Sequence, residues 1–317
     1  MNPQRPVVAT IGVFDGVHIG HQAIVARARR LADRLGDAAT LVAAFDPHPL
    51  ATLAPQRTPA ALSTFAHRRA LLQEAGADAV VPLLPTRPLL EQSPETFLQR
   101  FTERFHVVGF VEGEDFRFGK DRAGDVQTLQ RWAKAHAMAV EVVPPVEVDL
   151  TDQRLVRASS SLLRWLVEKG RVSDARRLLG RHYCVAGTVL PGDKRGRELG
   201  FPTANIDCPT LLPGDGVYAG FASDPTGRLW PAALSVGSKP SFPGGVRTLE
   251  AHLLGWNGAL DQYGWPATVH FLRRLRDQAR YRRLEALVEQ MRRDCARVHR
   301  ILSQVEPPLP CPAEAAA

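Results

Sequence analysis

The feature that most limits what this chain can fold into is a change of hydrophobic period near His182. Before that residue, apolar runs of strand length alternate with apolar stripes of helical spacing, beginning with Val7–Gly12 and the helical pattern that follows His21. Strands that alternate with helices need crossover connections, which build a mostly parallel sheet covered on both faces. Residues 1–181 therefore predict an α/β domain.

The second part of the chain has a different texture. From His182 to about Arg273, short β-like runs such as "YCVAGTVL" and "GVYAGFA" are separated by Gly- and Pro-containing turns. This pattern predicts a compact antiparallel β-barrel. An apolar stripe from Leu284 to Leu302, with arginines opposite, predicts a C-terminal helix docked on the barrel. We expect this domain to span residues 182–303 and residues 304–317 to form a flexible tail.

Composition excludes several classes of protein. With 317 residues, of which 44% are hydrophobic, the chain can bury two cores, so global disorder is excluded. No apolar run approaches the roughly 18 residues of a membrane helix. The first residues lack the pattern of a secretory signal, so we expect a cytoplasmic protein. The net charge of +7 favours anionic partners, and nucleotides satisfy it as well as nucleic acid does.

The stretch "GVFDGVHIGHQ" lies where the first strand ends and a helix starts. Ligands bind beyond the carboxyl ends of parallel strands. Gly16 suits a turn with positive φ, and Gly20 allows backbone to approach a bound group closely. If the helix starts near His21, its free N–H groups and the imidazoles of His18 and His21 form an anion site that stabilises charge on a phosphoryl group. The alternative is an ordinary glycine turn with two surface histidines.

A second polar group in the same half is "RLVRASSSLLR". Its hydroxyls, Ser159, Ser160 and Ser161, lie at a probable helix start, and Arg164 follows one turn later. Hydroxyls beside a guanidinium suit a pyrophosphate leaving group. Plain helix capping by the serines is the alternative, and the two roles are compatible.

The barrel half contains a glycine-punctuated basic loop, "PGDKRGRELGFPTANID". Gly192 and Gly200 permit a tight backbone path, while Lys194 and Arg197 add positive charge, so the loop can cover a triphosphate. It is not a P-loop, because the G-K-[ST] ending is missing.

Two residues after this loop have the right chemistry for a metal. Thr203 and Asn205 are two apart and face the same side of a strand, and their oxygens suit Mg²⁺ bound with a phosphate. The alternative is a basic hairpin with a hydrogen-bonded Thr/Asn pair.

The N-terminal motifs resemble a known family. "GVFDGVHIGHQ", "FDPHP", "GEDFRFGKDRAGD" and "ASSSLLRWLVEKGRVSDARRLLGRHY" together look like the adenylyltransferase module of bacterial bifunctional riboflavin kinase/FAD synthetase. The resemblance implies a Rossmann-like nucleotidyltransferase fold that joins FMN to the AMP part of ATP. His18 and His21 would contact ATP phosphates, and Arg164 with the serines would hold pyrophosphate. Asp115 would lie at the substrate site and His48 near the nucleotide.

The resemblance also implies further nucleotide- or flavin-binding positions, namely Gly12, Phe14, Asp15, Gly16, Gly20, Gly192, Lys194, Arg197, Gly200 and Pro202. The sequence departs from the family's pattern at two places in the first module. Ser161 stands where the family commonly has Thr, which keeps a hydroxyl. The family's Asn is absent where this chain reads Gly12-Val13.

The barrel half resembles the riboflavin kinase module over nearly its whole length, from the "GDKRGRELGFPTAN" stretch to "TLEAHLL". The resemblance implies transfer of the ATP γ-phosphate to the ribityl 5′-hydroxyl, with Glu250 as the catalytic acidic residue. The "SKPSF" segment (Ser238–Phe242) and a longer loop at 255–264 depart from the family. Trp256 and Tyr263 either flank the flavin ring or belong to the barrel core.

We therefore expect a two-domain transferase with Mg²⁺ at both phosphate-handling steps. Residues 1–181 would be the FMN adenylyltransferase and residues 182–303 the riboflavin kinase. The expected ligands are ATP, riboflavin, FMN and FAD, with no nucleic acid and no membrane. One alternative is an adenylyltransferase with a degenerate kinase module. Another is a non-catalytic flavin-binding regulator of nucleic acid, which only the net charge and the arginine-rich helix favour.

Overall fold

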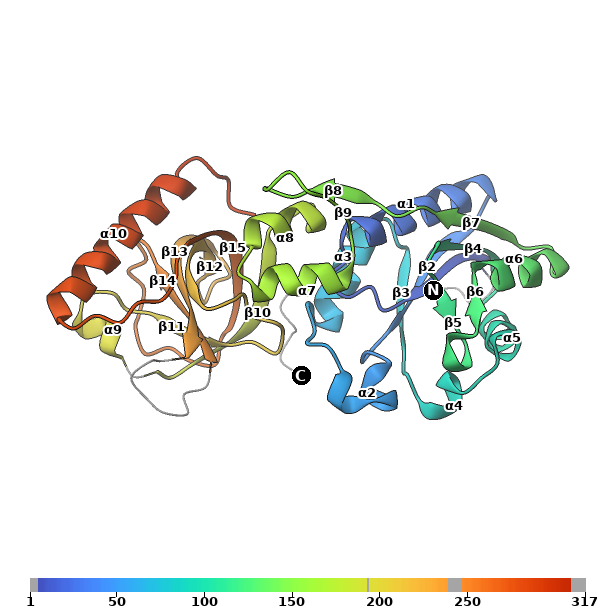
Figure 1. The fold of residues 1–317 in the computed structure, drawn as a ribbon, viewed down its shortest axis with the longest axis horizontal. Coiled ribbons are helices and arrows are strands. Elements are labelled where there is room, and N and C mark those ends of the chain that lie inside the picture. The colour runs from blue at the N-terminus through green and yellow to red at the C-terminus, as the bar shows by residue number, and fades with distance from the viewer. Residues whose placement is uncertain (1–4, 193, 239–246, 309–317) are drawn as a thin grey trace. The chain divides into compact units, whose positions relative to one another are not determined.

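The structure is a computed structural model that describes residues 5–192, 194–238 and 247–308. Its contacts divide the chain into two compact units. The first consists of Met1–Ala60, Arg68–Val148 and Leu155–Ser160, and the second of Ala61–His67, Asp149–Arg154 and Ser161–Ala317. Each unit has its own sheet and its own core (Figure 1).

The first unit is built on a parallel five-stranded sheet, as the alternating pattern predicted. Its strands are β1 (Val7–Gly12), β2 (Ala39–Phe45), β3 (Ala79–Leu83), β4 (Val107–Gly113) and β7 (Ala139–Val143). Their spatial order is β3-β2-β1-β4-β7, and every neighbouring pair runs parallel. Because the chain leaves β1 toward β2 and returns to β4 on the other side, the carboxyl ends of β1 and β4 form the topological switch point.

Helices cover this sheet on both faces (Figure 1). The longer ones are α1 (Ile19–Arg34), α3 (Phe65–Glu74), α5 (Pro94–Arg104) and α6 (Val126–Ala135). Short elements join them: α2 (Leu50–Leu53), η1 (Pro55–Arg57), α4 (Arg87–Leu90), η2 (Lys120–Arg122), and the paired strands β5 (Arg117–Phe118) with β6 (Gly124–Asp125) and β8 (Glu147–Asp149) with β9 (Leu155–Arg157). The predicted start of α1 near His21 was two residues late, because His18 is the N-cap.

The second unit contains the predicted antiparallel barrel. Its strands are β10 (Tyr183–Leu190), β11 (Ala204–Asp207), β12 (Gly216–Ser223), β13 (Leu229–Ser238), β14 (Arg247–Leu253) and β15 (Pro266–Arg276). They close into a barrel in the order β10-β11-β14-β13-β12-β15. The helices are α7 (Ser160–Glu168), α8 (Val172–Leu179), α9 (Arg195–Glu198) and α10 (Leu284–Leu302). The basic glycine loop thus contains one helical turn, α9, that its composition did not predict.

Helix α10 docks on the barrel through only part of its apolar stripe. Val298 and Leu302 are buried in a cluster with Phe221, Leu272 and other barrel residues. The stripe residues nearer the start of the helix, among them Met291, line a cavity instead. The C-terminal half of α10 therefore anchors the helix and its N-terminal half forms a wall.

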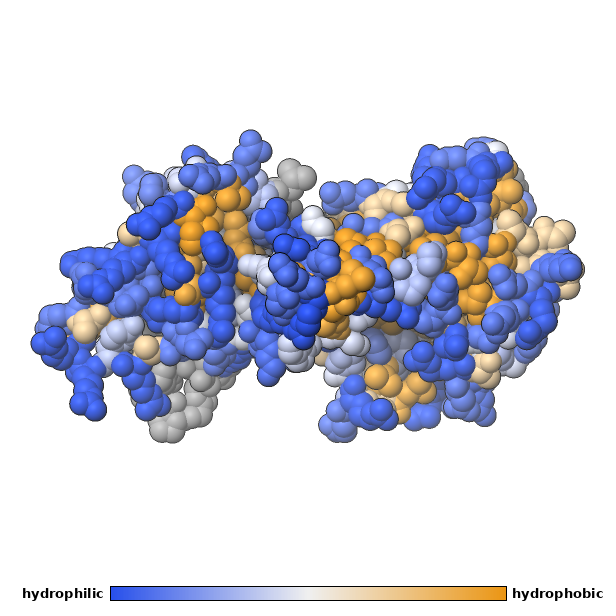
Figure 2. Space-filling view, turned by 45° about the horizontal axis from the view of Figure 1, so that its top comes forward, coloured by the Kyte–Doolittle hydropathy of each residue, from blue (hydrophilic) through white to orange (hydrophobic). Residues whose placement is uncertain are grey.

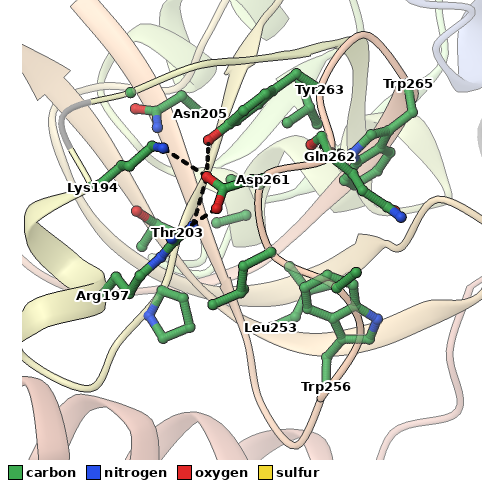
Figure 3. Close-up of a pocket in the computed structure, with 17 residues that line it drawn as sticks. Lys194, Arg197, Thr203, Asn205, Leu253, Trp256, Asp261, Gln262, Tyr263 and Trp265 are labelled. Carbon is green, nitrogen blue, oxygen red and sulfur yellow. Dashed lines mark hydrogen bonds and ion pairs between the residues drawn. The ribbon is translucent and has the colours of Figure 1, made fainter.

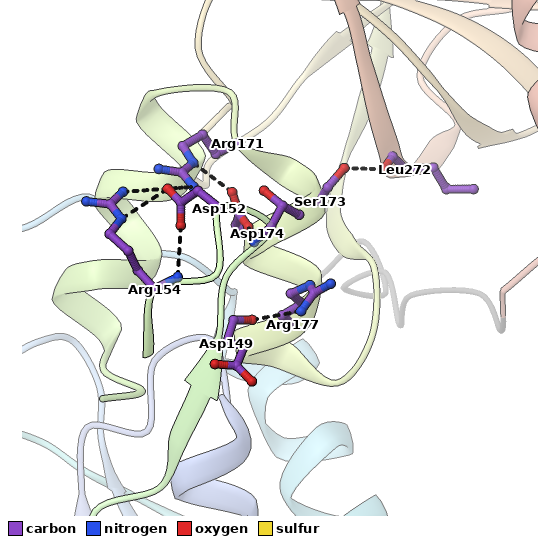
Figure 4. A network of polar contacts seen from close by, with 9 residues as sticks. Asp149, Asp152, Arg154, Arg171, Ser173, Asp174, Arg177 and Leu272 are labelled. Atoms are coloured by element: carbon purple, nitrogen blue, oxygen red, sulfur yellow. Dashed lines mark hydrogen bonds and ion pairs between the residues drawn. The ribbon is translucent and has the colours of Figure 1, made fainter. Parts of the chain in front are cut away.

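A polar network secures α8 within the second unit (Figure 4). Asp152 accepts hydrogen bonds from Arg154 and from Arg171, whose Nη2 lies 2.9 Å away. Asp174, which is 3% exposed, accepts from Arg171 Nε and from the backbone N–H of Thr151. The hydrogen bonds of Arg154 and Arg171 hold the pKa of Asp152 well below its ordinary value. The network fixes the turn at 149–154 against the helix.

The viewed face is mainly hydrophilic, with hydrophobic residues gathered in separate patches (Figure 2). Within the described ranges, no helix is both long enough and apolar enough to cross a membrane. Two expectations fall mainly outside those ranges. Of the atypical Ser238–Phe242 segment, only Ser238 is described, and of the expected tail at 304–317, only residues 304–308 are described.

Two histidines of the second unit are buried and held neutral. His67 is 7% exposed and His270 is 4% exposed. Burial, followed by the charge of Arg181, lowers the pKa of His67 to about 4. Burial, followed by the neighbouring His182 and His67, lowers the pKa of His270 to about 3. As the pH falls, each ring therefore takes up its proton at a higher pH in the unfolded chain than in the folded chain.

We therefore expect stability to fall as the pH is lowered from about 6.5 toward the folded-state pKa values. Each such histidine removes about 1.4 kcal/mol of unfolding free energy per pH unit in that window. The urea midpoint of the wild-type chain should be lower at pH 5 than at pH 7, and that of His67→Gln should fall less. Parallel profiles for the two proteins would contradict this assignment.

Candidate functional site

The turn between β1 and α1 is conformationally unusual. Phe14, Gly16 and Val17 all have positive φ, at 53°, 79° and 42°. Gly16 adopts this region without strain, whereas Phe14 and Val17 do so at a cost of about 1–3 kcal/mol each, which marks functional turns. The turn is fastened by the hydrogen bond from Val17 N to the Phe14 carbonyl, 3.1 Å long. The structure thus explains why Gly16 stands in "FDG".

The two histidines of the motif lie against each other. Their ring centroids are 3.7 Å apart with an interplanar angle of 20°. His18 Nδ1 accepts a hydrogen bond of 3.4 Å from His21 N, so His18 caps α1. In a neutral ring the proton is then on Nε2, which is a donor. The capping role and the anion-binding role that we predicted for His18 are therefore compatible.

A cavity of about 770 Å³ opens over this turn in the first unit. It brings together nine of the predicted residues: Gly12, Phe14, His18, Gly20, His21, His48, Asp115, Ser159 and Ser160. Its volume lies within the roughly 300–1,000 Å³ of ligand pockets. One part of its lining is apolar, formed by Phe45, Leu50, Leu53, Leu89, Leu90, Phe97, Phe116 and Phe118. The cavity therefore offers both polar groups and a ring-sized apolar surface.

Other predicted residues of this half have different surroundings. Asp15 is buried and its carbonyl accepts a 2.8 Å hydrogen bond from Ser160 Oγ, which ties the turn to the first residue of α7. His48 Nδ1 accepts a hydrogen bond of 3.1 Å from Leu50 N, the first residue of α2. Asp115 pairs with Arg157 at 3.1 Å. Ser161 and Arg164 belong to the second compact unit, and their roles stay predictions.

Arg68, which no sequence motif indicated, holds this site in place. It is 4% exposed, and its Nη1 donates to the carbonyls of Val13 at 2.6 Å and Phe45 at 2.9 Å. Its Nη2 contacts Asp46 at 2.7 Å. One guanidinium therefore ties the turn after β1 to the turn after β2 that carries His48. A buried arginine on a helix has no sequence signature of its own, so composition could not identify it.

A second missed residue is Glu112, near the end of β4. It lines the same cavity and is 2% exposed. Burial raises its pKa well above the ordinary value, against the hydrogen bonds from Ile11 and Thr10. A glutamate within an apolar strand pattern is unusual, and this feature of the sequence could have identified Glu112 as a candidate site residue.

In the second unit, the basic loop and the "PTAN" segment line one small cavity of about 80 Å³ (Figure 3). It contains the predicted Gly192, Lys194, Arg197, Pro202, Thr203 and Asn205. Gly192 packs closely against Asn205, because a Cβ there would lie 2.0 Å from Asn205 Nδ2 and would displace that side chain. Gly200, with φ of 85°, supports the turn and is not part of the lining.

The charges of this cavity converge on one carboxylate (Figure 3). Asp261 contacts Lys194 Nζ at 2.7 Å and both terminal nitrogens of Arg197 at 2.9 and 3.0 Å. Tyr263 Oη also donates to it. The hydrogen bonds from Arg197 and Lys194 hold the pKa of Asp261 far below its ordinary value. The pairing of this loop with the basic loop was not predicted.

A third cavity, of about 280 Å³, lies between barrel residues and α10. It contains Glu250, and its apolar lining includes Phe201, Val217, Leu234, Leu287 and Met291. Thr203 lines both this cavity and the basic one. Across the sheet, Glu250 is the register partner of Asn205. Trp256 and Tyr263 line the basic cavity and neither is buried, so neither belongs to the barrel core. The lining of the cavity that contains Glu250 includes neither of them.

Comparison with known proteins gives two family matches. Residues 1–156 match the FAD synthetase family and residues 179–302 match the riboflavin kinase family. A bifunctional riboflavin kinase/FMN adenylyltransferase of Pseudomonas fluorescens is 38% identical over 295 residues, covering 92% of each chain. The protein of the same description from Escherichia coli strain K12 is 31% identical over 299 residues, covering 92% of this chain and 91% of its own.

A solved structure also resembles the whole chain. It is described as a macrolide-efflux protein from Streptococcus pneumoniae, with a TM-score of 0.83 and 27% identity. The match covers 94% of this chain and 95% of the other. Its described activity has no counterpart in the family matches, and the likeness concerns the fold.

The role of Arg68 can be tested by comparison with its exposed neighbour Arg69. Arg68→Met removes the donor for two backbone carbonyls, and each unsatisfied group costs about 1–3 kcal/mol. We expect the unfolding free energy of the first unit to fall by about 2–4 kcal/mol in Arg68→Met, measured by urea denaturation. Arg69→Met should stay within about 0.5 kcal/mol of wild type. Equal effects in the two variants would show that Arg68 does not fasten the turns.

Proposed function

The chain belongs to the family of bifunctional riboflavin kinase/FMN adenylyltransferases, and from that premise we propose which residues perform each reaction. Riboflavin and ATP give FMN and ADP in the C-terminal part, and FMN with a second ATP gives FAD and pyrophosphate in the N-terminal part. We assign the first activity to residues 182–303 and the second to residues 1–181. One observation carries the residue assignment in the kinase: Thr203 lines a basic cavity and a carboxylate-containing apolar cavity at once.

For FAD formation, we place both substrates in the 770 Å³ cavity. A phosphate oxygen of FMN attacks the α-phosphorus of ATP, and the bond from that phosphorus to pyrophosphate breaks. The protein supplies no nucleophile, so its task is to orient the groups and stabilise charge. The N-terminus of α1, His18 and His21 face the developing negative charge. The apolar lining accepts ring systems.

The departing pyrophosphate needs its own donors. Ser159 and Ser160 line the cavity just before and at the start of α7. We propose that they act with Ser161 and Arg164, as the resemblance of "ASSSLLR" to the family implies. Charge-assisted hydrogen bonds of this kind are about twice as strong as neutral ones. Asp115 is proposed to contact substrate, where its pairing with Arg157 orients the carboxylate.

For FMN formation, we propose that the nucleotide phosphates lie in the basic cavity and riboflavin lies between the barrel and α10. The γ-phosphorus then meets the flavin hydroxyl near Thr203. The bond from phosphorus to the ADP oxygen breaks, the new bond forms to the hydroxyl oxygen, and the hydroxyl proton passes to Glu250. Since proton removal is late in a loose transition state, a carboxylate is an adequate base.

Thr203 and Asn205 fit a magnesium ion that arrives with the nucleotide. Both side chains line the basic cavity, beside Lys194 and Arg197. In the described part of the chain, no group of three or more His, Cys, Asp or Glu residues can hold a metal. Two neutral oxygen ligands plus substrate phosphates match the coordination habit of Mg²⁺. When bound, the ion neutralises charge on the phosphate oxygens.

The basic cavity is too small for a nucleotide as it stands. Its volume of about 80 Å³ compares with at least about 300 Å³ for ligand pockets. We propose that the loop carrying Asp261 moves aside when the polyphosphate takes over its contacts with Lys194 and Arg197. We also propose that the protein acts in the cytoplasm, on ATP and free flavins, without nucleic acid.

Removing one histidine should separate the two activities. His21→Ala takes away a donor from the transition state of adenylyl transfer, which typically lowers kcat by about 10²–10³-fold. Chromatography of products from riboflavin, ATP and Mg²⁺ should then show FMN without FAD. His136→Ala, an exposed histidine of the same unit outside the cavity, is the matched control. Normal FAD formation by His21→Ala would show that His21 has no role in adenylyl transfer.

The complementary change is Glu250→Gln. It keeps the side-chain shape and removes the proton acceptor, so riboflavin phosphorylation should fall by about 10²–10⁴-fold. Conversion of supplied FMN to FAD should continue at the wild-type rate, measured in the same assay. Glu285→Gln, at an exposed position of α10, should change neither rate. If Glu250→Gln abolished both steps in a folded chain, the division of labour would be wrong.

A further inference from the structure

The first unit contains a buried carboxyl group that the proposed chemistry does not use. Glu112 is 2% exposed near the end of β4. Its Oε1 accepts a hydrogen bond of 2.7 Å from Ile11 N, and its Oε2 lies 3.4 Å from Thr10 Oγ1. The first contact is short and the second is at the limit of a hydrogen bond. The interaction with the backbone of Ile11 is therefore the one that matters structurally.

This contact lies where the backbone pairing between β1 and β4 ends. The register between β1 and β4 runs through Val8↔Gly109 and Ala9↔Phe110 and goes no further. On its other side, β1 continues to pair with β2 as far as Gly12↔Ala44. Ile11 N therefore has a side chain of β4 as its partner in place of a backbone carbonyl. The Glu112 carboxyl occupies the space between two diverging strands.

The opening lies at the entrance to the turn that bears the two histidines. The cavity proposed for FAD formation is lined by Ile11, Gly12 and Glu112 as well as by His18 and His21. β1 and β4 form the switch point of the sheet, where ligands bind in α/β folds. The distance between the two strand ends sets both the width of the cavity and the direction in which β1 enters the turn.

The burial of the Glu112 carboxyl group suits a position between the ends of β1 and β4. Because the side chain is enclosed, its pKa is raised, which favours the uncharged form beside the phosphates of the substrates. An apolar side chain of the same size would leave Ile11 N without a partner, which is costly for a buried group. A glutamine would preserve the acceptor.

We propose that Glu112 is a positioning residue for adenylyl transfer: it replaces the missing backbone pairing between β1 and β4, holds the two strand ends apart, and so fixes the turn that carries His18 and His21. This inference rests on the proposed assignment of FAD formation to this cavity. It adds a residue that contacts no reacting atom and acts through the β1 turn.

The test compares Glu112→Leu with Glu112→Gln in the full-length chain. Misplaced histidines lose contacts made in the transition state, so Glu112→Leu should lower kcat for FAD formation by about 10-fold to 100-fold. Its KM for ATP and FMN should change less than threefold. Glu112→Gln should remain within threefold of wild type, because its amide oxygen still accepts from Ile11 N. Riboflavin phosphorylation by the same samples reports that the second unit is intact.

Glu95→Leu is the matched control, because it makes the same replacement at an exposed position of α5 in the same unit. It should leave FAD formation unchanged. A wild-type kcat for Glu112→Leu would overturn the proposal. So would a Gln variant as slow as the Leu variant, since that result would require the acid proton itself.

If Glu112→Leu fails to fold in the first unit, as judged by protease resistance, Glu112→Asp decides. It is one methylene shorter and cannot span the gap, so it should be at least tenfold slower than Glu112→Gln; equal rates would overturn the proposal. The underlying site is tested separately by His21→Ala. If His21→Ala abolishes FAD formation while Glu112→Leu does not change it, only the positioning role of Glu112 is wrong.

Discussion

The requirement that buried backbone groups find hydrogen-bond partners governs both units. In the barrel it is met by closure, since β10 pairs with both β11 and β15. In the parallel sheet, backbone pairing between β1 and β4 stops at Ala9↔Phe110, before the carboxyl ends of these two strands. There two side chains take over: Arg68 donates to the carbonyls of Val13 and Phe45, and Glu112 accepts from Ile11 N. The histidine-bearing turn depends on these substitutes.

The sequence predicted the elements whose signal is local. Val7–Gly12 reads as a buried strand because the parallel sheet encloses it on both faces, and Ser93 starts α5 because its hydroxyl can accept from Thr96 N. The barrel was predictable from its turn spacing. In contrast, the first turn of α1 was misplaced because a histidine is an unusual N-cap, although its Nδ1 performs that role here.

What the sequence did not predict arises from contacts between distant segments. Arg68 lies 55 residues from Val13, and Asp261 lies 64 residues from Arg197. A single sequence contains no signal for such pairs. The family resemblance identified the motif residues and the overall class of reaction, yet it was silent on Arg68, Glu112 and Asp261. These three organise the groups that the motifs supply.

The cluster around Asp261 has a consequence for the kind of ligand that the basic cavity selects. Its two cations already hold an internal counterion, and exposed ion pairs of this type are weak. A monovalent anion gains little by exchanging places with a carboxylate of equal charge. A chain of phosphates can engage Lys194 and Arg197 together and brings more charge than it displaces. The cavity therefore favours polyvalent anions over chloride and other monovalent anions.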